Sequence, residues 1–326
     1  MKEKVFVTRR IPIQGLELIQ GKFDTSVWPQ DEPPSKEEII QLAKDCTGLV
    51  TLLSDTIDKE AIERLPKLRV ISQYAVGYDN IDVKYATEKG IIVTNTPGVL
   101  TETTADLTWA LIMATARRIV EADRYVREGR WQVAWGPELL LGTDIHGATL
   151  GIMGMGRIGY SVAKRASGFN MKVLFYNRSE NEFTKKIVTE GAQSTDFEIL
   201  LRESDIVSLH IPLNSDTYHM IGRREISMMK QGAILINTSR GQVIDEKALD
   251  EALKTHHLGG AGLDVFDEEP INPKNSLLNH PNVVITPHIG SASVHTRATM
   301  AQMCAENLIA AMKGTIPTNI VNPEVL

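Results

Sequence analysis

The chain has 326 residues, of which 42% are hydrophobic and 23% are charged, and its formal net charge is −6. This length suits two domains, because single hydrophobic cores stop growing at roughly 250–300 residues. The acidic balance, without a run of lysine or arginine, argues against nucleic acid or an anionic membrane as a partner.

The first hundred residues alternate short apolar runs with amphipathic stretches. We expect strands at 4–8, 48–53, 68–73 and 90–96, and helices at 36–45, 58–65 and 82–90. Such alternation predicts a parallel sheet flanked by helices.

A helical stretch follows at 101–130. It opens at Thr101 with Glu102 and Asp106 behind it, and its first half is apolar on most faces. We interpret it as one long helix that connects two domains and contributes to a subunit interface. A long core helix with a solvated end fits the pattern equally well.

The alternation then resumes, with strands expected at 148–154, 172–177, 206–212, 233–239, 261–266 and 283–287. This rhythm is typical of a doubly wound nucleotide-binding domain. The last stretch, 291–314, predicts one helix that Gly314 and Pro317 end. The pattern leaves open which domain it packs on.

The first of these later strands runs into Gly154-Met-Gly156-Arg-Ile-Gly159, and a helix follows. In this context the glycines indicate a dinucleotide-binding turn. Gly154 would permit the turn, Gly156 would let the backbone approach a pyrophosphate, and Gly159 would let the helix pack on the strand. The alternative is a strand–helix turn that serves structure alone.

The next strand ends in Asn177-Arg178-Ser179, where an NAD site usually carries an acidic residue that binds the ribose 2′-hydroxyl. Asn177 removes that charge, Arg178 offers a planar fork of donors, and Ser179 adds a hydroxyl. We therefore predict NADP(H) as the preferred cofactor, with NAD(H) also accepted. The alternative is a strand-end turn with a solvated arginine.

Three later strands are followed by residues suited to acid–base chemistry on a keto acid. Arg240 could bind a carboxylate, His288 could donate a proton to a carbonyl oxygen, and a carboxylate of the cluster 267–269 could orient the histidine. Each residue has a structural alternative as a loop, capping or turn residue. Their shared position beyond strand ends favours the functional interpretation.

The chain resembles the D-isomer-specific 2-hydroxyacid dehydrogenases, and among them the glyoxylate/hydroxypyruvate reductases of archaeal type. The resemblance rests on GIMGMGRIG, INTSRG, GLDVFDEEP and PHIGSAS, and on YAVGYDNIDV and TNTPGVLTETTADL in the first part. It implies two Rossmann-like parallel-sheet domains with a cleft between them. The substrate domain, flavodoxin-like and discontinuous, would comprise 1–98 and 290–326, and the NAD(P)-binding domain 99–289.

The resemblance also implies roles for individual residues. Arg240, Glu269 and His288 match the catalytic trio. Substrate would in addition contact Leu53, the backbone of Ala75, Val76 and Gly77, and Trp135, which reaches into the active site of the partner in a homodimer. Besides the glycine turn and residues 177–179, the dinucleotide would contact Thr104, Arg157, Ile158, His210, Pro212, Thr217, Thr238, Ser239, Asp264 and Gly290.

These expectations describe an enzyme that uses NADPH to reduce glyoxylate or hydroxypyruvate. Two alternatives stay open: an NADH-dependent enzyme for D-lactate or a bulkier 2-keto acid, and a dinucleotide-sensing protein on the same scaffold. Because no regulatory domain follows residue 326, we do not expect one of the longer phosphoglycerate dehydrogenases.

No metal site is expected, because the histidines show no ligand spacing. The two cysteines lie far apart, the N-terminal stretch lacks the pattern of a signal peptide, and no apolar run is long enough to span a bilayer. We therefore expect a cytoplasmic protein.

Overall fold

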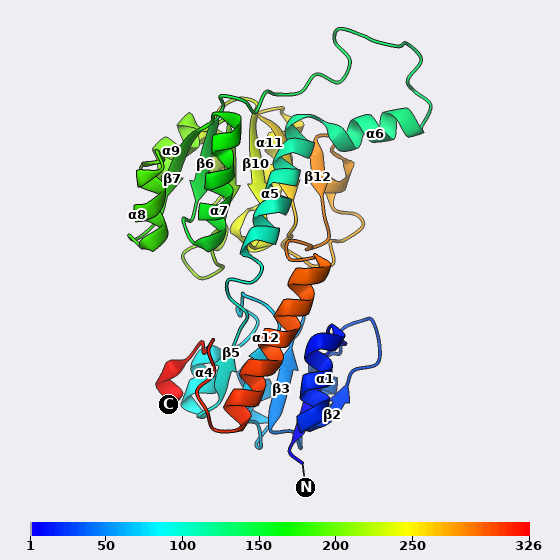
Figure 1. Cartoon of the computed structure of the whole chain (residues 1–326). Helices are drawn as coiled ribbons and strands as arrows, with labels where there is room; N and C mark the ends of the chain where they lie inside the picture. The colour runs from blue at the N-terminus through cyan, green and yellow to red at the C-terminus, as the bar shows by residue number, and fades with distance from the viewer. Residues whose placement is uncertain (1) are drawn as a thin grey trace. The chain divides into compact units, whose positions relative to one another are not determined.

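The computed structural model describes residues 2–326, and the chain divides into two α/β units. Unit 1 runs from the N-terminus to Leu100 and takes up the chain again at Ser291–Leu326. Unit 2 comprises Thr101–Gly290. Each unit is built on one parallel sheet, which confirms the predicted fold class (Figure 1).

The sheet of unit 1 has five parallel strands in the order β2-β1-β3-β4-β5. This order is that of flavodoxin-like folds. The strands are β1 (Lys4–Val7), β2 (Asp24–Val27), β3 (Gly48–Thr51), β4 (Val70–Gln73) and β5 (Ile92–Thr94). The helices are α1 (Ile13–Lys22), α2 (Lys36–Ala43), α3 (Lys59–Glu63), α4 (Val83–Glu88) and α12 (Val294–Met312).

The predicted strands and helices of this unit all form, but the sequence prediction missed β2 and α1. The strand β2 reads DTSV and none of its residues is fully buried. Because an edge strand can form with little burial, it carries no strong apolar signal.

The final helix, α12, belongs to unit 1. Its N-cap Ser293 accepts a hydrogen bond from the Thr296 N–H, and Gly314 follows the helix with a left-handed φ of 75°. It packs so closely on α1 that a Cβ at Gly15 would collide with the backbone of Ala301. The chain therefore returns from unit 2 to complete the first unit.

The sheet of unit 2 has seven parallel strands in the order β12-β11-β10-β9-β6-β7-β8. From β8 to β11 this is the strand order of a dinucleotide-binding Rossmann domain, with β12 added at the edge. The strands are β6 (Thr149–Met153), β7 (Lys172–Tyr176), β8 (Gln193–Ser194), β9 (Ile206–Leu209), β10 (Ala233–Asn237), β11 (Leu258–Leu263) and β12 (Val283–Ile285). The helices are α5 (Thr101–Ala116), α6 (Ile119–Arg127), α7 (Arg157–Arg165), α8 (Glu182–Thr189), α9 (Phe197–Glu203), α10 (Arg223–Met228) and α11 (Glu246–Lys254).

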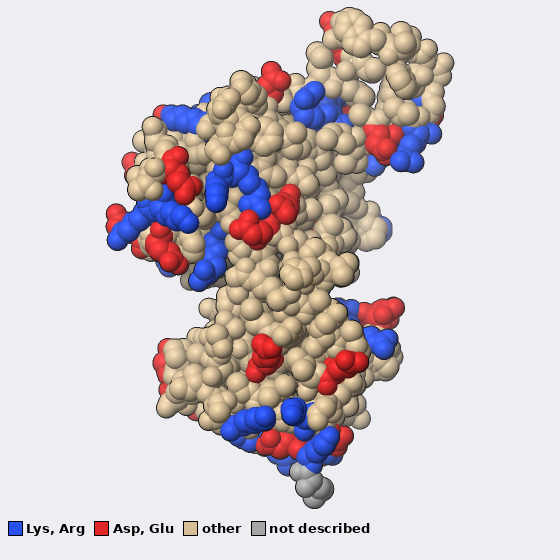
Figure 2. All heavy atoms as spheres, in the orientation of Figure 1, with Lys and Arg blue, Asp and Glu red and all other residues tan. Residues whose placement is uncertain are grey.

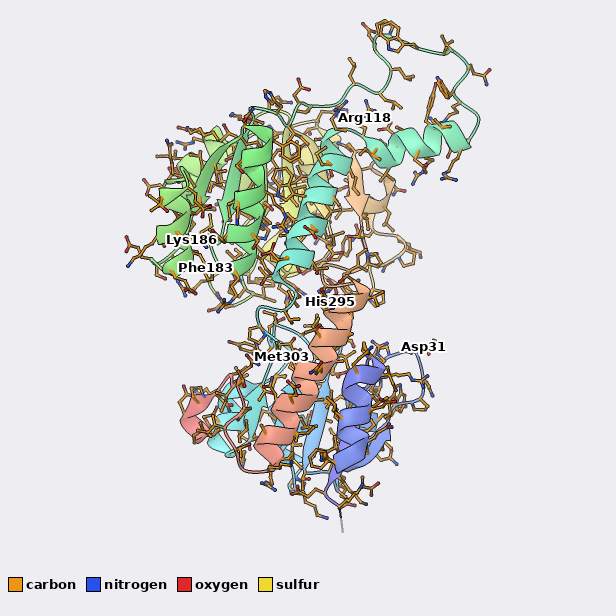
Figure 3. All side chains as sticks on the ribbon, in the orientation of Figure 1. Asp31, Arg118, Phe183, Lys186, His295 and Met303 are labelled. Carbon is orange, nitrogen blue, oxygen red and sulfur yellow. The ribbon has the colours of Figure 1, made fainter. Side chains whose placement is uncertain are left out.

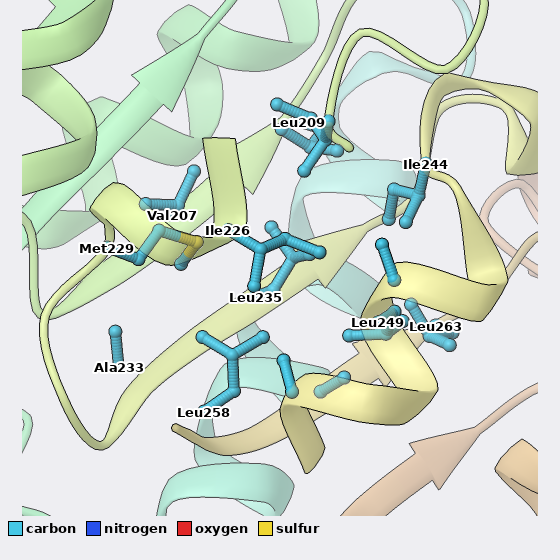
Figure 4. Packing of buried hydrophobic residues seen from close by; sticks show 14 of the residues in the cluster. Val207, Leu209, Ile226, Met229, Ala233, Leu235, Ile244, Leu249, Leu258 and Leu263 are labelled. Carbon is cyan, nitrogen blue, oxygen red and sulfur yellow. The ribbon is translucent and has the colours of Figure 1, made fainter. Parts of the chain in front are cut away.

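The centre of this sheet is fully buried. All five residues of β10 are buried, and Leu235 packs in one cluster with Ile226 of α10 and Leu249 of α11 (Figure 4). Strands that are buried on both faces read as continuous apolar runs, which is why the sequence located them well. The two-residue edge strand β8 was missed for the opposite reason.

The expected strand at 261–266 begins earlier, at Leu258, and ends at Leu263. The sequence prediction was wrong here because Gly259 and Gly260 have little strand propensity. A Cβ at Gly260 would lie 2.8 Å from the Thr115 side chain, and one at Gly262 would lie 3.0 Å from Leu111. These glycines therefore let α5 pack directly against β11.

The single helix predicted at 101–130 was also wrong, because the structure has two helices there. Arg118 adopts a left-handed φ of 53° between α5 and α6, at the position labelled in Figure 3. Its guanidinium binds both carboxylate oxygens of Glu121, at 2.8 and 2.9 Å. The helix α5 carries all the burial, whereas no residue of α6 is buried.

Candidate active site

The glycine turn between β6 and α7 has the geometry that a dinucleotide requires. Gly154 adopts a left-handed φ of 93°, and a Cβ there would lie 2.5 Å from the His210 carbonyl oxygen. A Cβ at Gly159 would collide with the Gly154 carbonyl oxygen. By contrast, a Cβ at Gly156 would have no neighbour among the described residues within 4 Å, so the turn is open where a pyrophosphate would approach.

Two asparagines hold this turn in place. The Asn177 Oδ1 atom accepts a hydrogen bond from the Met155 N–H at 2.9 Å, and the Asn181 Nδ2 atom donates one to the Met155 carbonyl at 3.1 Å. Asn177 therefore has a structural role in the turn besides the absence of charge on which the cofactor prediction relied. Sequence reasoning missed that role.

Arg178 lies at the end of β7, where the ribose of a bound dinucleotide would lie. Its Nη1 atom is 3.0 Å from Asp216 Oδ2, and both side chains are largely exposed. Asp216 belongs to the loop after β9 and was not singled out from the sequence. Arg178 is therefore paired with a carboxylate from the loop that follows a different strand.

The other residues expected at the cofactor lie in unit 2, most of them beyond strand ends. His210, Pro212 and Thr217 follow β9, and the Thr217 hydroxyl donates to the Pro212 carbonyl at 2.7 Å. Burial lowers the pKa of His210 to about 3, and its Nε2 atom lies 2.9 Å from the Ser208 hydroxyl. His210 is therefore neutral at physiological pH.

The remaining members of this set lie on α5, at the start of α7, and after β10, β11 and β12. The Thr238 and Thr108 hydroxyls are 2.9 Å apart, and the Ser239 N–H donates to Asn237 Oδ1 at 3.0 Å. Thr104 is buried on α5. Arg157 and Ile158 open α7, and Asp264 and Gly290 follow β11 and β12.

The trio expected to be catalytic lies at the carboxyl ends of three adjacent strands. Arg240 follows β10, Glu269 follows β11 and His288 follows β12. His288 Nδ1 is 2.7 Å from Glu269 Oε2, with 29% and 36% of their side chains exposed. The structure thus brings the histidine and the carboxylate together, although they lie 19 positions apart in the sequence.

His288 is held rigidly by Asp264. It adopts a left-handed φ of 53°, and its N–H donates to the Asp264 carbonyl at 2.9 Å. The Asp264 carboxylate accepts hydrogen bonds from the Thr286 hydroxyl at 2.6 Å and from the Ile289 and Gly290 N–H groups, both at 2.8 Å. This carboxylate therefore fixes the backbone on both sides of the histidine.

The electrostatics of the pair favour an ionised Glu269. Burial would raise its pKa, but the hydrogen bond and charge of His288, the Phe266 N–H and the charge of Arg240 outweigh this and lower the pKa overall. The carboxylate occupies His288 Nδ1, so Nε2 is the nitrogen available to a substrate. Arg240 is anchored nearby, since its Nη1 atom donates to the Ser239 carbonyl at 2.9 Å.

The other substrate residues expected from the sequence belong to other parts of the chain. Leu53, Ala75, Val76 and Gly77 belong to unit 1, in the turns that follow β3 and β4. Trp135 lies in the segment between α6 and β6 and is 77% exposed.

Within residues 2–326, no cluster of three His, Cys, Asp or Glu side chains could hold a metal ion. Over the same residues, no helix is long and apolar enough to cross a membrane.

A glycine turn at the start of a helix, together with a histidine–carboxylate pair at neighbouring strand ends, is the arrangement of a dinucleotide-dependent oxidoreductase. Comparison with known proteins supports this class. Residues 109–290 match the family model described as D-isomer specific 2-hydroxyacid dehydrogenase, NAD binding domain.

Similar proteins extend the match to the whole chain. A glyoxylate reductase of Korarchaeum cryptofilum is 58% identical over 327 residues, which cover 100% of this chain and 98% of that relative. A crystal structure of a Thermus thermophilus protein has 46% identity and a TM-score of 0.90, covering 98% of this chain and 99% of the other. An NADPH-dependent glyoxylate/hydroxypyruvate reductase of Sinorhizobium meliloti, solved with NADP and malonate, has 30% identity and a TM-score of 0.86, covering 100% and 98%.

The chain therefore belongs to the D-isomer-specific 2-hydroxyacid dehydrogenase family and is an NAD(P)-dependent oxidoreductase. This confirms the family predicted from the sequence motifs.

Proposed function

We propose that this enzyme uses NADPH to reduce glyoxylate and hydroxypyruvate to glycolate and D-glycerate. The observation that carries the proposal is the His288–Glu269 pair, 2.7 Å apart. The two residues follow β12 and β11, and Arg240 follows β10, the next strand of the same sheet. The 58% identity with a glyoxylate reductase supports the choice of a small 2-keto acid.

In this proposal Arg240 binds the substrate carboxylate with two hydrogen bonds, as a guanidinium does. The N–H groups of Val76 and Gly77 bind the same carboxylate, and Leu53 contacts the remainder of the substrate. When bound, NADPH would supply the hydride that adds to the carbonyl carbon and would be left as NADP+. As that bond forms, the carbonyl electron pair moves to the oxygen, and His288 Nε2 donates a proton there. Glu269 holds the imidazolium and balances its charge.

The cofactor preference is the first test. With glyoxylate as substrate, we expect NADPH to exceed NADH in kcat/KM by about tenfold or more, which is worth roughly 1.4 kcal/mol. Asn177→Asp/Arg178→Ile should reverse the ratio. The double variant removes the guanidinium that would donate hydrogen bonds to the 2′-phosphate, and it adds a carboxylate that can accept one from the ribose 2′-hydroxyl. Aspartate keeps an oxygen for the Met155 N–H, so the glycine turn should persist. It loses the Nδ2 donor to the Ser179 carbonyl, so the backbone at 178–179 should shift. A wild-type preference for NADH would contradict this assignment.

Asp216 offers a second arm of the same experiment. Because its carboxylate competes with a 2′-phosphate for Arg178, Asp216→Asn should raise kcat/KM for NADPH severalfold at low ionic strength. The value for NADH should stay the same or fall. The carboxylate also gives a specific reason to keep NADH use as the alternative, since it could accept a hydrogen bond from a ribose hydroxyl.

The same assay separates the rival functions. Turnover of D-lactate or a bulkier 2-keto acid with NADH, in preference to glyoxylate, would favour the broader dehydrogenase. Binding of NADPH without turnover of any 2-keto acid would favour a dinucleotide-sensing protein.

We further propose a cytoplasmic homodimer in which the segment around Trp135 contacts the partner subunit. Trp131, Val133, Trp135 and Leu141 are all exposed in the loop between α6 and β6. Figure 2 shows this loop as mostly tan, and its charged residues are Glu128, Arg130, Glu138 and Asp144. An apolar surface of this kind is typical of a protein interface.

Sedimentation of the wild type should therefore give a dimer. Trp131→Ser/Trp135→Ser should weaken the dimer, and Trp135→Ser alone should raise KM for the substrate. Leu42→Ser, at an exposed leucine of α2 in unit 1, is the control. A monomeric wild type would contradict the proposal.

A further inference from the structure

The loop after β4 is held by three hydrogen bonds to its backbone carbonyls. The donors all come from unit 1: the Thr96 N–H to Ala75 at 2.9 Å, Asn95 Nδ2 to Val76 at 2.8 Å, and Gln73 Nε2 to Gly77 at 3.2 Å. Each successive peptide carbonyl of the loop is therefore fixed from outside the loop.

Fixing a carbonyl also fixes the N–H of the following residue. A trans peptide is planar, so the C=O of one residue and the N–H of the next point in opposite directions. The bond from Asn95 to the Val76 carbonyl therefore directs the Gly77 N–H away from Asn95. The bond from Thr96 to the Ala75 carbonyl directs the Val76 N–H in the same manner.

Asn95 is itself anchored by the C-terminal segment of unit 1, Ser291–Leu326. Its N–H donates to the Asn319 carbonyl at 3.2 Å, and its carbonyl accepts from Asn307 Nδ2 at 3.1 Å. Asn307 is only 3% exposed on α12. The Asn95 side chain thus projects from a backbone that is held on both sides.

We propose that Asn95 is a positioning residue for the substrate carboxylate. Its side-chain amide sets the orientation of the Val76–Gly77 peptide, so that the Gly77 N–H is ready to bind a carboxylate before substrate arrives. The proposal rests on the assignment of the Val76 and Gly77 amides in the proposed function. Preorganised donors cost no reorientation when the ligand binds, and so they tighten binding.

The test is Asn95→Asp. The new carboxylate cannot donate to the Val76 carbonyl and would repel it, so the peptide should rotate. We expect KM for glyoxylate to rise about tenfold, worth roughly 1.4 kcal/mol, with kcat and the Kd of NADPH within about twofold of wild type. Asn95→Ser replaces the amide donor with a shorter hydroxyl and adds no charge, so it should raise KM by a smaller factor.

Asn322→Ser is the matched control for Asn95→Ser. Asn322 is also in unit 1, is 1% exposed, and donates through Nδ2 to the Ile91 carbonyl at 2.8 Å. It should lower Tm at least as much as Asn95→Ser does, yet leave KM unchanged. The proposal is wrong, and Asn95 supports the fold only, if its variants lower Tm without raising KM. The same holds if the loss of kcat/KM comes from kcat and not from KM.

Binding of malonate to the NADPH complex, followed by cofactor fluorescence, gives a readout that needs no turnover. Its Kd should rise about tenfold in Asn95→Asp, in step with KM. If the wild type binds malonate but does not reduce glyoxylate, the proposed reaction is wrong. Malonate binding would then still measure the role of Asn95. Unchanged malonate binding in Asn95→Asp would overturn that role.

Discussion

Replacing His288 with alanine should lower kcat for glyoxylate by about a thousandfold, within the range of roughly 10²–10⁴ that a positioned general acid contributes. Without the imidazole, the developing alkoxide must take its proton from water. The Kd of NADPH should change little, since the histidine is proposed to act on the substrate oxygen. Steady-state rates and cofactor fluorescence measure the two quantities.

A second histidine–carboxylate pair in unit 2 provides the control. His280 Nε2 lies 2.8 Å from Asp250 Oδ1, and both side chains are 12% exposed. His280→Ala removes the same kind of contact from a site away from the carboxyl ends of the strands. It should therefore reduce Tm without reducing kcat. Near-normal turnover of the His288 variant would refute its role as the acid.

Glu269→Gln tests the partner of the histidine. Glutamine can still accept the hydrogen bond from the Phe266 N–H, now 3.0 Å from Glu269 Oε1, but it carries no charge to stabilise an imidazolium. We expect kcat to fall by a smaller factor than in His288→Ala. An equal loss in both variants would indicate that the pair acts as a single unit.

Replacing Arg240 with glutamine should lower kcat/KM for glyoxylate by about a thousandfold, equivalent to roughly 4 kcal/mol. The change removes the charge-assisted, bidentate contact that we propose to the substrate carboxylate, and losing such a contact costs about 2–5 kcal/mol in comparable pairs. Arg240→Lys should lose less, because an ammonium keeps the charge but not the planar fork. Malonate binding should weaken in the same order.

Arg202→Gln is the control, because it removes an exposed arginine of α9 that pairs with Glu198 at 3.2 Å. It should leave kcat/KM and malonate binding unchanged. If Arg240→Gln changes KM by less than about threefold, which is under roughly 1 kcal/mol, the arginine does not bind the substrate carboxylate.

Local patterns in the sequence located most of the fold. Buried parallel strands are continuous apolar runs, so β10 and its neighbours were found with small errors in their ends. The break at Arg118 was not visible, because charged helix formers continue across it. At the break, Arg118 makes its bidentate contact with Glu121, the Thr143 N–H donates to the Ala116 carbonyl at 2.8 Å, and burial ends with α5.

The residue types and spacings also predicted the glycine turn, and they placed Arg240, a carboxylate of the cluster 267–269 and His288 beyond strand ends. The choice of Glu269 within that cluster came from the resemblance to the family. Their rigidity could not be predicted. The hydrogen bonds of Asp264 to both sides of His288, and those of Asn177 and Asn181 to Met155, join residues by geometry that no local pattern records. Such bonds depend on how the ends of separate strands meet.

The sequence by itself therefore determined the sheet architecture, the class of cofactor and the candidate acid, because these depend on apolar periodicity and on residue chemistry. The tertiary structure alone decided that Asp216 lies 3.0 Å from Arg178 and that Asn95 holds the Val76 carbonyl. Each of these contacts joins loops from different strands of one sheet. Their distance is set by the order of the strands, which neither segment encodes locally.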